Sequence, residues 1–87
     1  MLGTSQSGRG VHGVSDTFIG VVGESASGVG GNFSGGLAPL RLQPASNVGP
    51  PAAGDHRRGE LFVDSGGALF FCVADGNPGT WRQVHLI

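Results

Sequence analysis

The residue types that could perform catalysis are present in this sequence, but no arrangement of them marks an active site. Among the many serines, none lies in the Gly-x-Ser-x-Gly turn that exposes the nucleophile of α/β-hydrolases. Cys72 lies between Phe71 and Val73 in an apolar run, which favours an inert buried thiol over a reactive one. We therefore predict that the chain is not an enzyme and has no catalytic residues.

Three histidines are the candidate metal ligands. His12, His56 and His85 have no zinc-ligand spacing to one another or to Cys72. If three chains shared a three-fold axis, His12 or His85 from each chain could surround a metal ion, but a surface or hydrogen-bonded histidine is the simpler interpretation. No helical pattern follows the glycines of residues 28–31, as a phosphate-binding loop would require. We predict no metal site and no cofactor.

The candidate ligand contacts are Trp81, Arg82, His56 and Arg58. Tryptophan and arginine dominate binding hot spots, and a flat indole ring stacks well on sugar rings. A carbohydrate-binding module that uses Trp81, Arg82 and the loop from His56 to Arg58 is therefore one interpretation. In the other, Trp81 completes the core of a small sheet and Arg82 is a solvated charge at its edge.

These residues would be positioned by a C-terminal unit, residues 59–87, that has a clear strand pattern. Strands are predicted over 60–64, 68–74 and 80–87, separated by a Ser-Gly-Gly turn and by the turn signals of residues 75–79. Three such strands form an antiparallel meander, which is close to the minimum for a stable sheet. The middle strand is apolar on both sides, so both faces of this sheet need cover.

The preceding segment, residues 37–58, is predicted to form one strand and a loop. Leu40 and Leu42 alternate with Arg41, and Pro39, which donates no backbone hydrogen bond, places this strand at a sheet edge. Residues 45–58 then form a long loop with two adjacent prolines. Loops of this length are usually functional or mobile, so this one is a candidate for partner contact.

The first third of the chain, residues 1–36, contains a repeat of ten residues. Gly-x-Ser triplets begin at positions 3, 13 and 23, and Gly-Val pairs begin at positions 10 and 20. A periodic sequence indicates a stacked or wound architecture whose units cannot bury a face alone. Ten residues fit short strands with glycine corners rather than a helix pair. We predict a glycine-rich shaft of β-helix or solenoid type; a flexible Gly/Ser linker is the alternative.

The composition leaves little side-chain bulk for a core. Glycine occupies 18 of the 87 positions, well above an ordinary share of roughly 7%. Small domains with thin cores need disulfides, a metal or oligomerisation, and a single cysteine excludes an intrachain disulfide. Oligomerisation is the remaining means. The predicted oligomer core consists of Val11, Val21, Leu40, Leu42, Phe62, Leu69, Phe71 and Val73.

The charge pattern argues against two classes of partner. The net charge is −1, from five arginines and six acidic residues. Only Arg57 and Arg58 are adjacent cations, so no basic patch for nucleic acid is predicted. No apolar run approaches the 18 residues of a membrane-spanning helix, and the first residues show no signal-peptide pattern. We expect neither nucleic-acid binding nor membrane insertion.

The repeats and the closing unit together resemble fibrous phage-tail and related bacterial surface proteins. The likeness is carried by the Gly-Val-x-Gly-x-Ser units of residues 10–15 and 20–25, by Leu40-Arg41-Leu42, and by the strand pattern of residues 59–82. The resemblance implies a homotrimer whose chains wind into a β-rich shaft and cap. It also implies an extracellular, cell-surface or virion-associated location, and in some members a contact with surface glycan.

The sequence thus predicts an all-β fold: a repeat shaft (1–36) in an intertwined trimer, a strand with a Pro/Gly loop (37–58), and a three-stranded antiparallel meander as a cap (59–87). The predicted function is structural, as a fibre element or filament module of adhesin type, with itself as partner and a receptor-binding tip as one form. The rivals are the carbohydrate-binding module and a monomeric β-solenoid scaffold.

Overall fold

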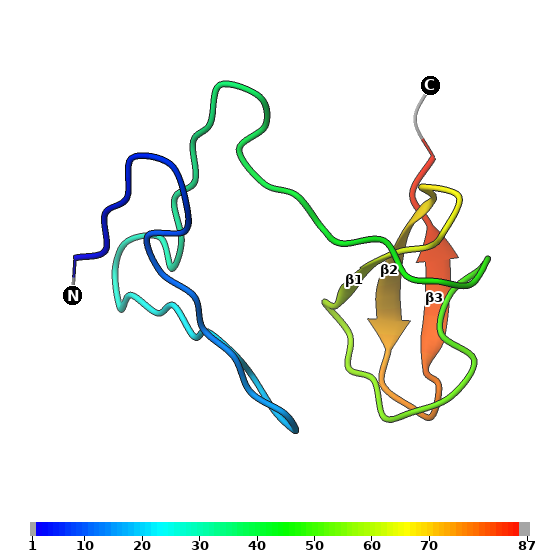
Figure 1. Cartoon of the computed structure of the whole chain (residues 1–87). Coiled ribbons are helices and arrows are strands. Elements are labelled where there is room, and N and C mark those ends of the chain that lie inside the picture. Colours follow the sequence, from blue (N-terminus) through cyan, green and yellow to red (C-terminus); the bar gives the residue numbers. More distant parts are fainter. Residues whose placement is uncertain (1, 86–87) are drawn as a thin grey trace. The chain divides into compact units, whose positions relative to one another are not determined.

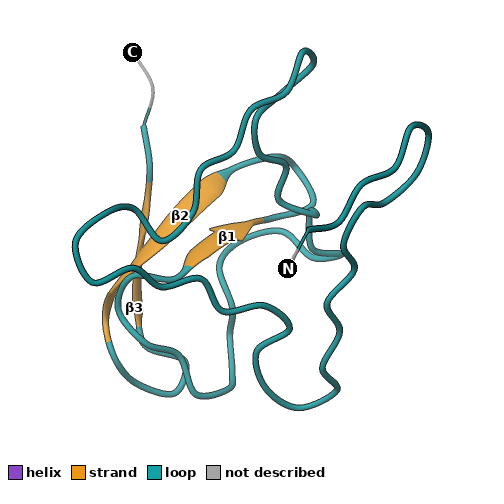
Figure 2. Ribbon diagram, turned by 90° about the vertical axis from the view of Figure 1, so that its left-hand side faces the viewer, coloured by secondary structure: helices purple, strands orange, loops and turns teal. Residues whose placement is uncertain are grey.

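The computed structural model describes residues 2–85, and the chain divides into two compact units. The first unit is Met1–Ser34 and the second is Gly35–Ile87. The predicted segment 37–58 therefore lies in the same unit as the meander. All regular secondary structure of the described residues lies in the second unit, and it consists of strands alone (Figures 1 and 2).

The second unit is built on a three-stranded antiparallel sheet. Its strands are β1 (Leu61–Val63), β2 (Leu69–Ala74) and β3 (Thr80–Gln83), in the order β1-β2-β3. Figure 1 shows β2 between its two neighbours, as the sequence order of a meander requires. The structure confirms the all-β class and the three-stranded antiparallel meander.

The strands are shorter than the sequence pattern predicts. β1 and β3 contain three and four residues, although the backbone N–H of Val84 still donates to the Leu69 carbonyl at 2.7 Å. The pairing of β2 with β3 shifts between Cys72 and Ala74, which makes Val73 the extra residue of a bulge. Residues 86 and 87, the predicted end of the third strand, lie outside the described residues.

Strand pairing sorts the side chains of the sheet onto two faces. Phe62 is opposite Phe70, and Cys72 is opposite Trp81, so these four share one side, the Trp81 face. Phe70 and Cys72 are its most buried members, at 9% and 0% exposure. The other side, the Phe71 face, follows from the remaining pairs and from alternation along the strands. Its members are Leu61, Val63, Leu69, Phe71, Arg82 and Val84.

The two outer edges of the sheet differ. The Ala45 N–H donates to the Val63 carbonyl at 2.8 Å, and the Ser65 N–H donates to the Asn47 carbonyl at 3.0 Å. The chain before the sheet therefore covers the outer edge of β1. The outer edge of β3 has no such neighbour among residues 2–85.

Asp64 anchors this covering segment. The side chain is 3% exposed, and its carboxylate accepts hydrogen bonds from the backbone N–H groups of Gly49 (2.8 Å), Gly66 (3.0 Å) and Ala68 (2.9 Å). The bond from Gly49 is the first cause of an Asp64 pKa below its ordinary value. The buried charge is thus satisfied by donors from the turn after β1 and from the covering segment.

The ten-residue repeats form pinched loops rather than strands. In each repeat two glycines seven positions apart bring their backbones into contact. A Cβ at Gly10, Gly20 or Gly30 would lie 3.0, 2.9 or 2.9 Å from the carbonyl oxygen of the paired glycine, Gly3, Gly13 or Gly23. Real side chains do not tolerate such distances, so these positions require glycine.

A serine hydroxyl closes each loop from inside. Ser5 accepts a hydrogen bond from the Gly8 N–H at 2.9 Å, and Ser25 does the same for Gly28 at 2.9 Å. In the middle repeat, Ser15 accepts from the Phe18 N–H at 3.1 Å. The Gly-x-Ser triplets of the sequence therefore have a local structural role: they build the turn of each loop.

Two predicted elements are not formed in the isolated chain. Residues 2–36 contain no strand, so the predicted β-helix shaft is not shown. Residues 37–42 form no edge strand either, and the prediction of a strand there is wrong for a single chain. The physical reason is the same in both cases: a strand needs a partner edge, and these segments meet none among the described residues.

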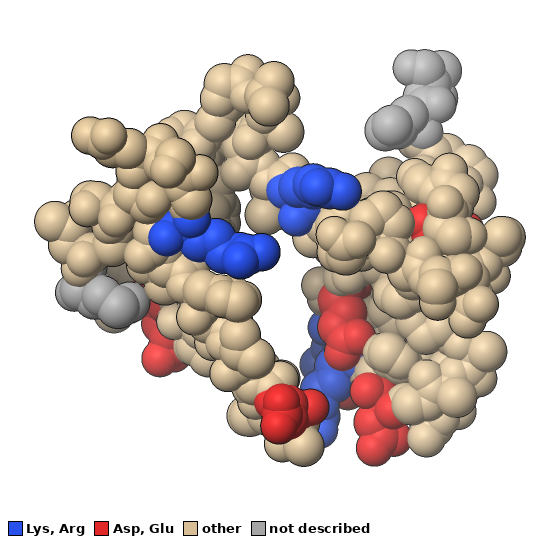
Figure 3. Space-filling model, viewed as in Figure 1, with Lys and Arg blue, Asp and Glu red and all other residues tan. Residues whose placement is uncertain are grey.

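The molecular surface carries few charges. In Figure 3 most of the visible face is neither acidic nor basic. Apolar side chains contribute much of the exposed surface instead. In the first unit, which contains the repeats, they are Leu2, Val11, Val14, Phe18, Ile19, Val21, Val22, Val29 and Phe33.

Candidate functional site

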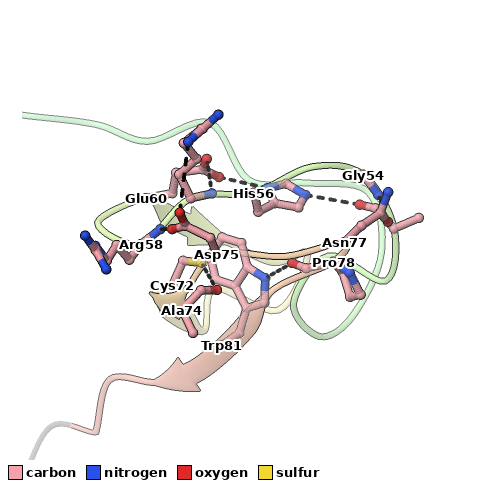
Figure 4. A network of polar contacts seen from close by, with 12 residues as sticks. Gly54, His56, Arg58, Glu60, Cys72, Ala74, Asp75, Asn77, Pro78 and Trp81 are labelled. Carbon is pink, nitrogen blue, oxygen red and sulfur yellow. Dashed lines mark hydrogen bonds and ion pairs between the residues drawn. The ribbon is translucent and has the colours of Figure 1, made fainter.

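The loop of residues 53–60, packed on the Trp81 face, carries a network of polar contacts in the second unit (Figure 4). His56 and Gly76 exchange two backbone hydrogen bonds, of 2.8 and 3.0 Å. The Arg58 N–H donates to the Asp75 carboxylate at 2.8 Å. These contacts join the loop before β1 to the turn between β2 and β3. The loop is therefore held in place by residues far away in sequence.

Asn77 adds a second link between the same two segments. Its side-chain oxygen accepts a hydrogen bond from the Gly54 N–H at 2.9 Å, and its amide nitrogen donates to the Asp55 carboxylate at 3.3 Å. The peptide bond from Asn77 to Pro78 is cis. Asn77 thus satisfies donors and acceptors of the loop together.

His56 lies at the centre of this group, and its ring is held from both sides. Nδ1 lies 2.8 Å from the Glu60 carboxylate, and Nε2 lies 3.1 Å from the Ala53 carbonyl oxygen. Both partners can only accept, so the doubly protonated imidazolium fits both contacts. The hydrogen bond to Glu60 raises the pKa of His56 above its ordinary value and lowers the pKa of Glu60.

Trp81 packs beneath this loop. Its ring meets His56 edge-on, with centroids 5.2 Å apart, and meets Phe62 at 6.0 Å. The indole N–H donates to the Pro78 carbonyl at 2.8 Å. The one polar atom of the Trp81 side chain is thus satisfied within the chain, and the half-buried ring closes the core of the sheet.

A shallow hollow of about 260 Å³ opens beside the loop. Its walls combine two carboxylates, one imidazole, one guanidinium and one side-chain amide. The residues are Asp55, His56, Arg57, Asp75, Gly76 and Asn77. These groups can bind hydroxyls or ions. No serine, threonine or cysteine lines the hollow. The thiol of Cys72 is fully buried and donates to the Ala74 carbonyl at 3.3 Å.

The structure separates the four predicted ligand contacts. His56 and Trp81 lie together on the Trp81 face. Arg82 is opposite Phe71 and therefore projects from the other side of the sheet. Arg58 joins the site through its backbone N–H. A single patch that contains Trp81 and Arg82 side by side is not present.

The predicted oligomer core is also divided. Leu69 and Phe71 lie on the Phe71 face, and Phe71 is 40% exposed. Phe62 lies on the opposite face against Trp81. Val73, in the bulge, is half-buried, as is Leu42, whereas Val11, Val21 and Leu40 are exposed.

Several residues of the site carry no strong signal in the sequence. Glu60 lies four positions after His56, a spacing that could have suggested a pair. Asp55, Asp75 and Asn77 are typical turn residues, and a turn role alone does not predict that they meet. Their contacts depend on the folding of residues 53–60 onto the turn after β2, which no local pattern encodes.

Neither a metal-ligand cluster nor a membrane-spanning helix is found among the described residues. Residues 2–85 contain no group of three His, Cys, Asp or Glu side chains that could hold a metal ion. No helix of this part of the chain is long and apolar enough to cross a membrane.

Fold and site together define the class as a small all-β module with a three-stranded antiparallel sheet. A loop rich in polar contacts packs on one face of this sheet, and apolar side chains are exposed on the other. Protein-family models, curated proteins and solved structures were compared with the chain, and none of them matches.

Proposed function

We propose that this chain is a structural module that works as a homo-oligomer, a trimer or a longer filament of phage-tail-like or surface-fibre type. One observation carries the proposal: the Phe71 face of the sheet is uncovered. Phe71, Leu61 and Val84 are 40%, 50% and 38% exposed. They lie on the same face of the sheet, on β2, on β1 and directly after β3, with Arg82 beside Phe71 on β3.

Burial of the apolar side chains on this face by a partner would be energetically favourable. Complete burial of a Leu, Val or Phe side chain stabilises a protein by about 1.5–3 kcal/mol relative to full exposure. The face is part-exposed over Leu61, Leu69, Phe71 and Val84, and large continuous apolar patches on soluble monomers usually mark interaction sites. A copy of the same chain is present wherever the chain itself is, and it offers matching apolar surface.

The repeat unit supports the same conclusion. Val11 and Val21 occupy equivalent places in successive repeats and are 54% and 69% exposed. The side chains of Val11 and Val21 lie beside Gly3 and Gly13, yet more than half of each stays exposed. Units that cannot bury a face alone become stable when neighbours stack on them. An extracellular or virion-associated fibre, which the resemblance of the sequence implies, requires such stacking.

The test is the mass of the purified chain in solution, by native mass spectrometry and by light scattering over a hundredfold range of concentration. We expect a trimer or a larger species in which three chains form the basic unit. A chain that stays at 8.7 kDa throughout this range and unfolds cooperatively would overturn the proposal.

Glycan contact at the hollow beside His56 is the second candidate function. The observation in its favour is the lining itself, because carboxylate, guanidinium and amide groups are the usual partners of sugar hydroxyls. A glycan array probed with the wild-type chain and with Arg57→Ala tests it. The Arg57 side chain is 84% exposed, so this variant should fold normally. Binding that Arg57→Ala weakens supports the site, and no binding by the wild-type chain excludes it.

A further inference from the structure

The outer edge of β3 is a free hydrogen-bonding edge. The Val84 N–H points toward β2, where it donates to the Leu69 carbonyl. Backbone groups alternate in direction along a strand, so those of Trp81 and Gln83 point away from β2. Within residues 2–85, no backbone hydrogen bond reaches this side of β3. An open edge of this kind is a template for another strand.

The chain also contains a strand pattern that has found no partner. Residues 37–42 alternate Leu40 and Leu42 with Arg41, yet they form no strand. Leu37 and Leu40 are strongly exposed, and Leu42 is half-buried. Among residues 2–85, the second unit therefore has one vacant sheet edge and one segment whose strand pattern pairs with no edge.

The geometry points to strand exchange between copies: residues 40–42 of one chain pair with the outer edge of another chain, along the end of β3 and the residue that follows it. This inference rests on the proposed assembly and names the contact that makes it. The added strand would use main-chain hydrogen bonds for affinity, as in other cases of strand addition to a sheet edge.

The segment cannot reach this edge within its own chain. Ala45 is fixed at the outer edge of β1 by its bond to Val63. The position beyond β3 lies four strand spacings away, about 19 Å at roughly 4.8 Å each. The three Cα–Cα steps from Leu42 to Ala45 span at most about 11 Å. A strand at residues 40–42 on the β3 edge must therefore come from a second copy.

Side-chain chemistry selects a register. With Arg41 opposite Gln83 in an antiparallel pair, Leu42 lies beside Arg82 and Leu40 beside Val84, so both leucines extend the Phe71 face. Pro39 then falls beyond the described end of β3, where its missing N–H costs little. A contact of one segment with a different edge is heterologous, and such contacts close into a ring or continue as a filament.

Blocking the acceptor edge tests the inference. In Gln83→Pro the lost N–H is one that points away from β2, so the sheet keeps its internal bonds while the edge loses a donor. Gln83→Ala is the matched control. We expect the wild-type chain and Gln83→Ala to assemble, and Gln83→Pro to remain at 8.7 kDa with the near-ultraviolet circular dichroism of a packed Trp81. Assembly of Gln83→Pro at the wild-type concentration would overturn the inference but leave the proposed function standing. A monomeric wild-type chain would overturn both.

A crosslink keeps the test decisive if Gln83→Pro fails to fold. Chains carrying Arg41→Cys and Gln83→Cys are mixed and oxidised; Cys72 is fully buried and does not compete. Paired strand positions lie within disulfide range. A bond between position 41 of one chain and position 83 of the other is expected. A product that joins two copies through position 83 only, or no product from an assembled mixture, contradicts the pairing.

Discussion

At the scale of single residues, the pair of His56 and Glu60 makes the stability of the second unit depend on pH. The His56 pKa is raised, chiefly by its hydrogen bond to the Glu60 carboxylate. The contribution of His56 to the stability of the fold is therefore complete below the unfolded-state pKa of about 6.5, and it is lost as pH rises through the raised pKa of the folded state. The Glu60 pKa is lowered, so its contribution is present above about 4.3 and is lost as pH falls through the lowered value.

We expect His56→Gln to lower the free energy of unfolding at pH 6, by at most about 1 kcal/mol because the pair is partly exposed. The deficit relative to the wild-type chain should shrink by pH 9. Urea unfolding followed by the fluorescence of Trp81, the only tryptophan, measures both values. Glu60→Gln should show the same trend. A deficit that stays constant from pH 6 to pH 9 would mean that the charge of His56 has no part in it.

At acid pH, Asp64 makes the stability of the second unit depend on pH. Its pKa is lowered, first by the hydrogen bond from Gly49, so the carboxylate stabilises the fold above about 3.9 and this stabilisation disappears as pH falls through the lowered value. Asp64→Asn should lower the urea midpoint at pH 7 and flatten the loss of stability between pH 5 and pH 2. Asp16→Asn, in the repeat unit, is the control and should change neither quantity.

The turn between β2 and β3 is the element on which the polar loop rests, and Gly79 is its critical position. Its φ is +82°, and a Cβ there would lie 2.9 Å from the Ala74 carbonyl oxygen. Gly79→Ala should cost about 1 kcal/mol or more, since both the backbone conformation and the space exclude a side chain. Gly36→Ala, where a Cβ meets nothing within 4 Å, should stay within about 0.5 kcal/mol. Urea midpoints compare the two variants.

The elements differ in how well the sequence predicts them. Strands β1, β2 and β3 could be predicted from apolar runs bounded by strong turn signals. In a meander each strand pairs with its neighbour in sequence, so the sequence pattern shows both strands of each pair. Residues 37–42 show the same alternation but no strand, since alternation does not say where a partner edge lies. The loop to which His56 belongs could not be predicted, because its contacts with the turn after β2 are non-local.

Repeat spacing was readable in the sequence, but its structural meaning was not. The ten-residue period predicts that successive units are equivalent, and the pinched loops at Gly13 and Gly23 repeat the one at Gly3. The serine hydroxyls that close these loops act over three residues, so they produce turns rather than the strands of the predicted shaft.

At the scale of the whole molecule, we expect substitutions on the two faces of β2 to affect folding and assembly differently. Phe71→Asp changes a side chain that is 40% exposed, and Phe70→Asp changes one that is 9% exposed. We expect Phe71→Asp to leave a folded single chain, because the new charge stays in water but blocks a dry interface. Phe70→Asp should unfold the sheet. Mass and near-ultraviolet circular dichroism distinguish these outcomes; an assembled Phe71→Asp chain would place the interface elsewhere.

Within the described part of the chain, residues 45–47 cover one edge of the sheet and the other edge is open, and this asymmetry gives each copy a polarity. If strand exchange builds the assembly, every subunit donates at one side and accepts at the other, so growth is directional. A Gln83→Pro subunit still donates residues 40–42 but cannot accept them. Small amounts of it, added to wild-type chains, should therefore act as a chain terminator and shorten any filament in proportion to its share.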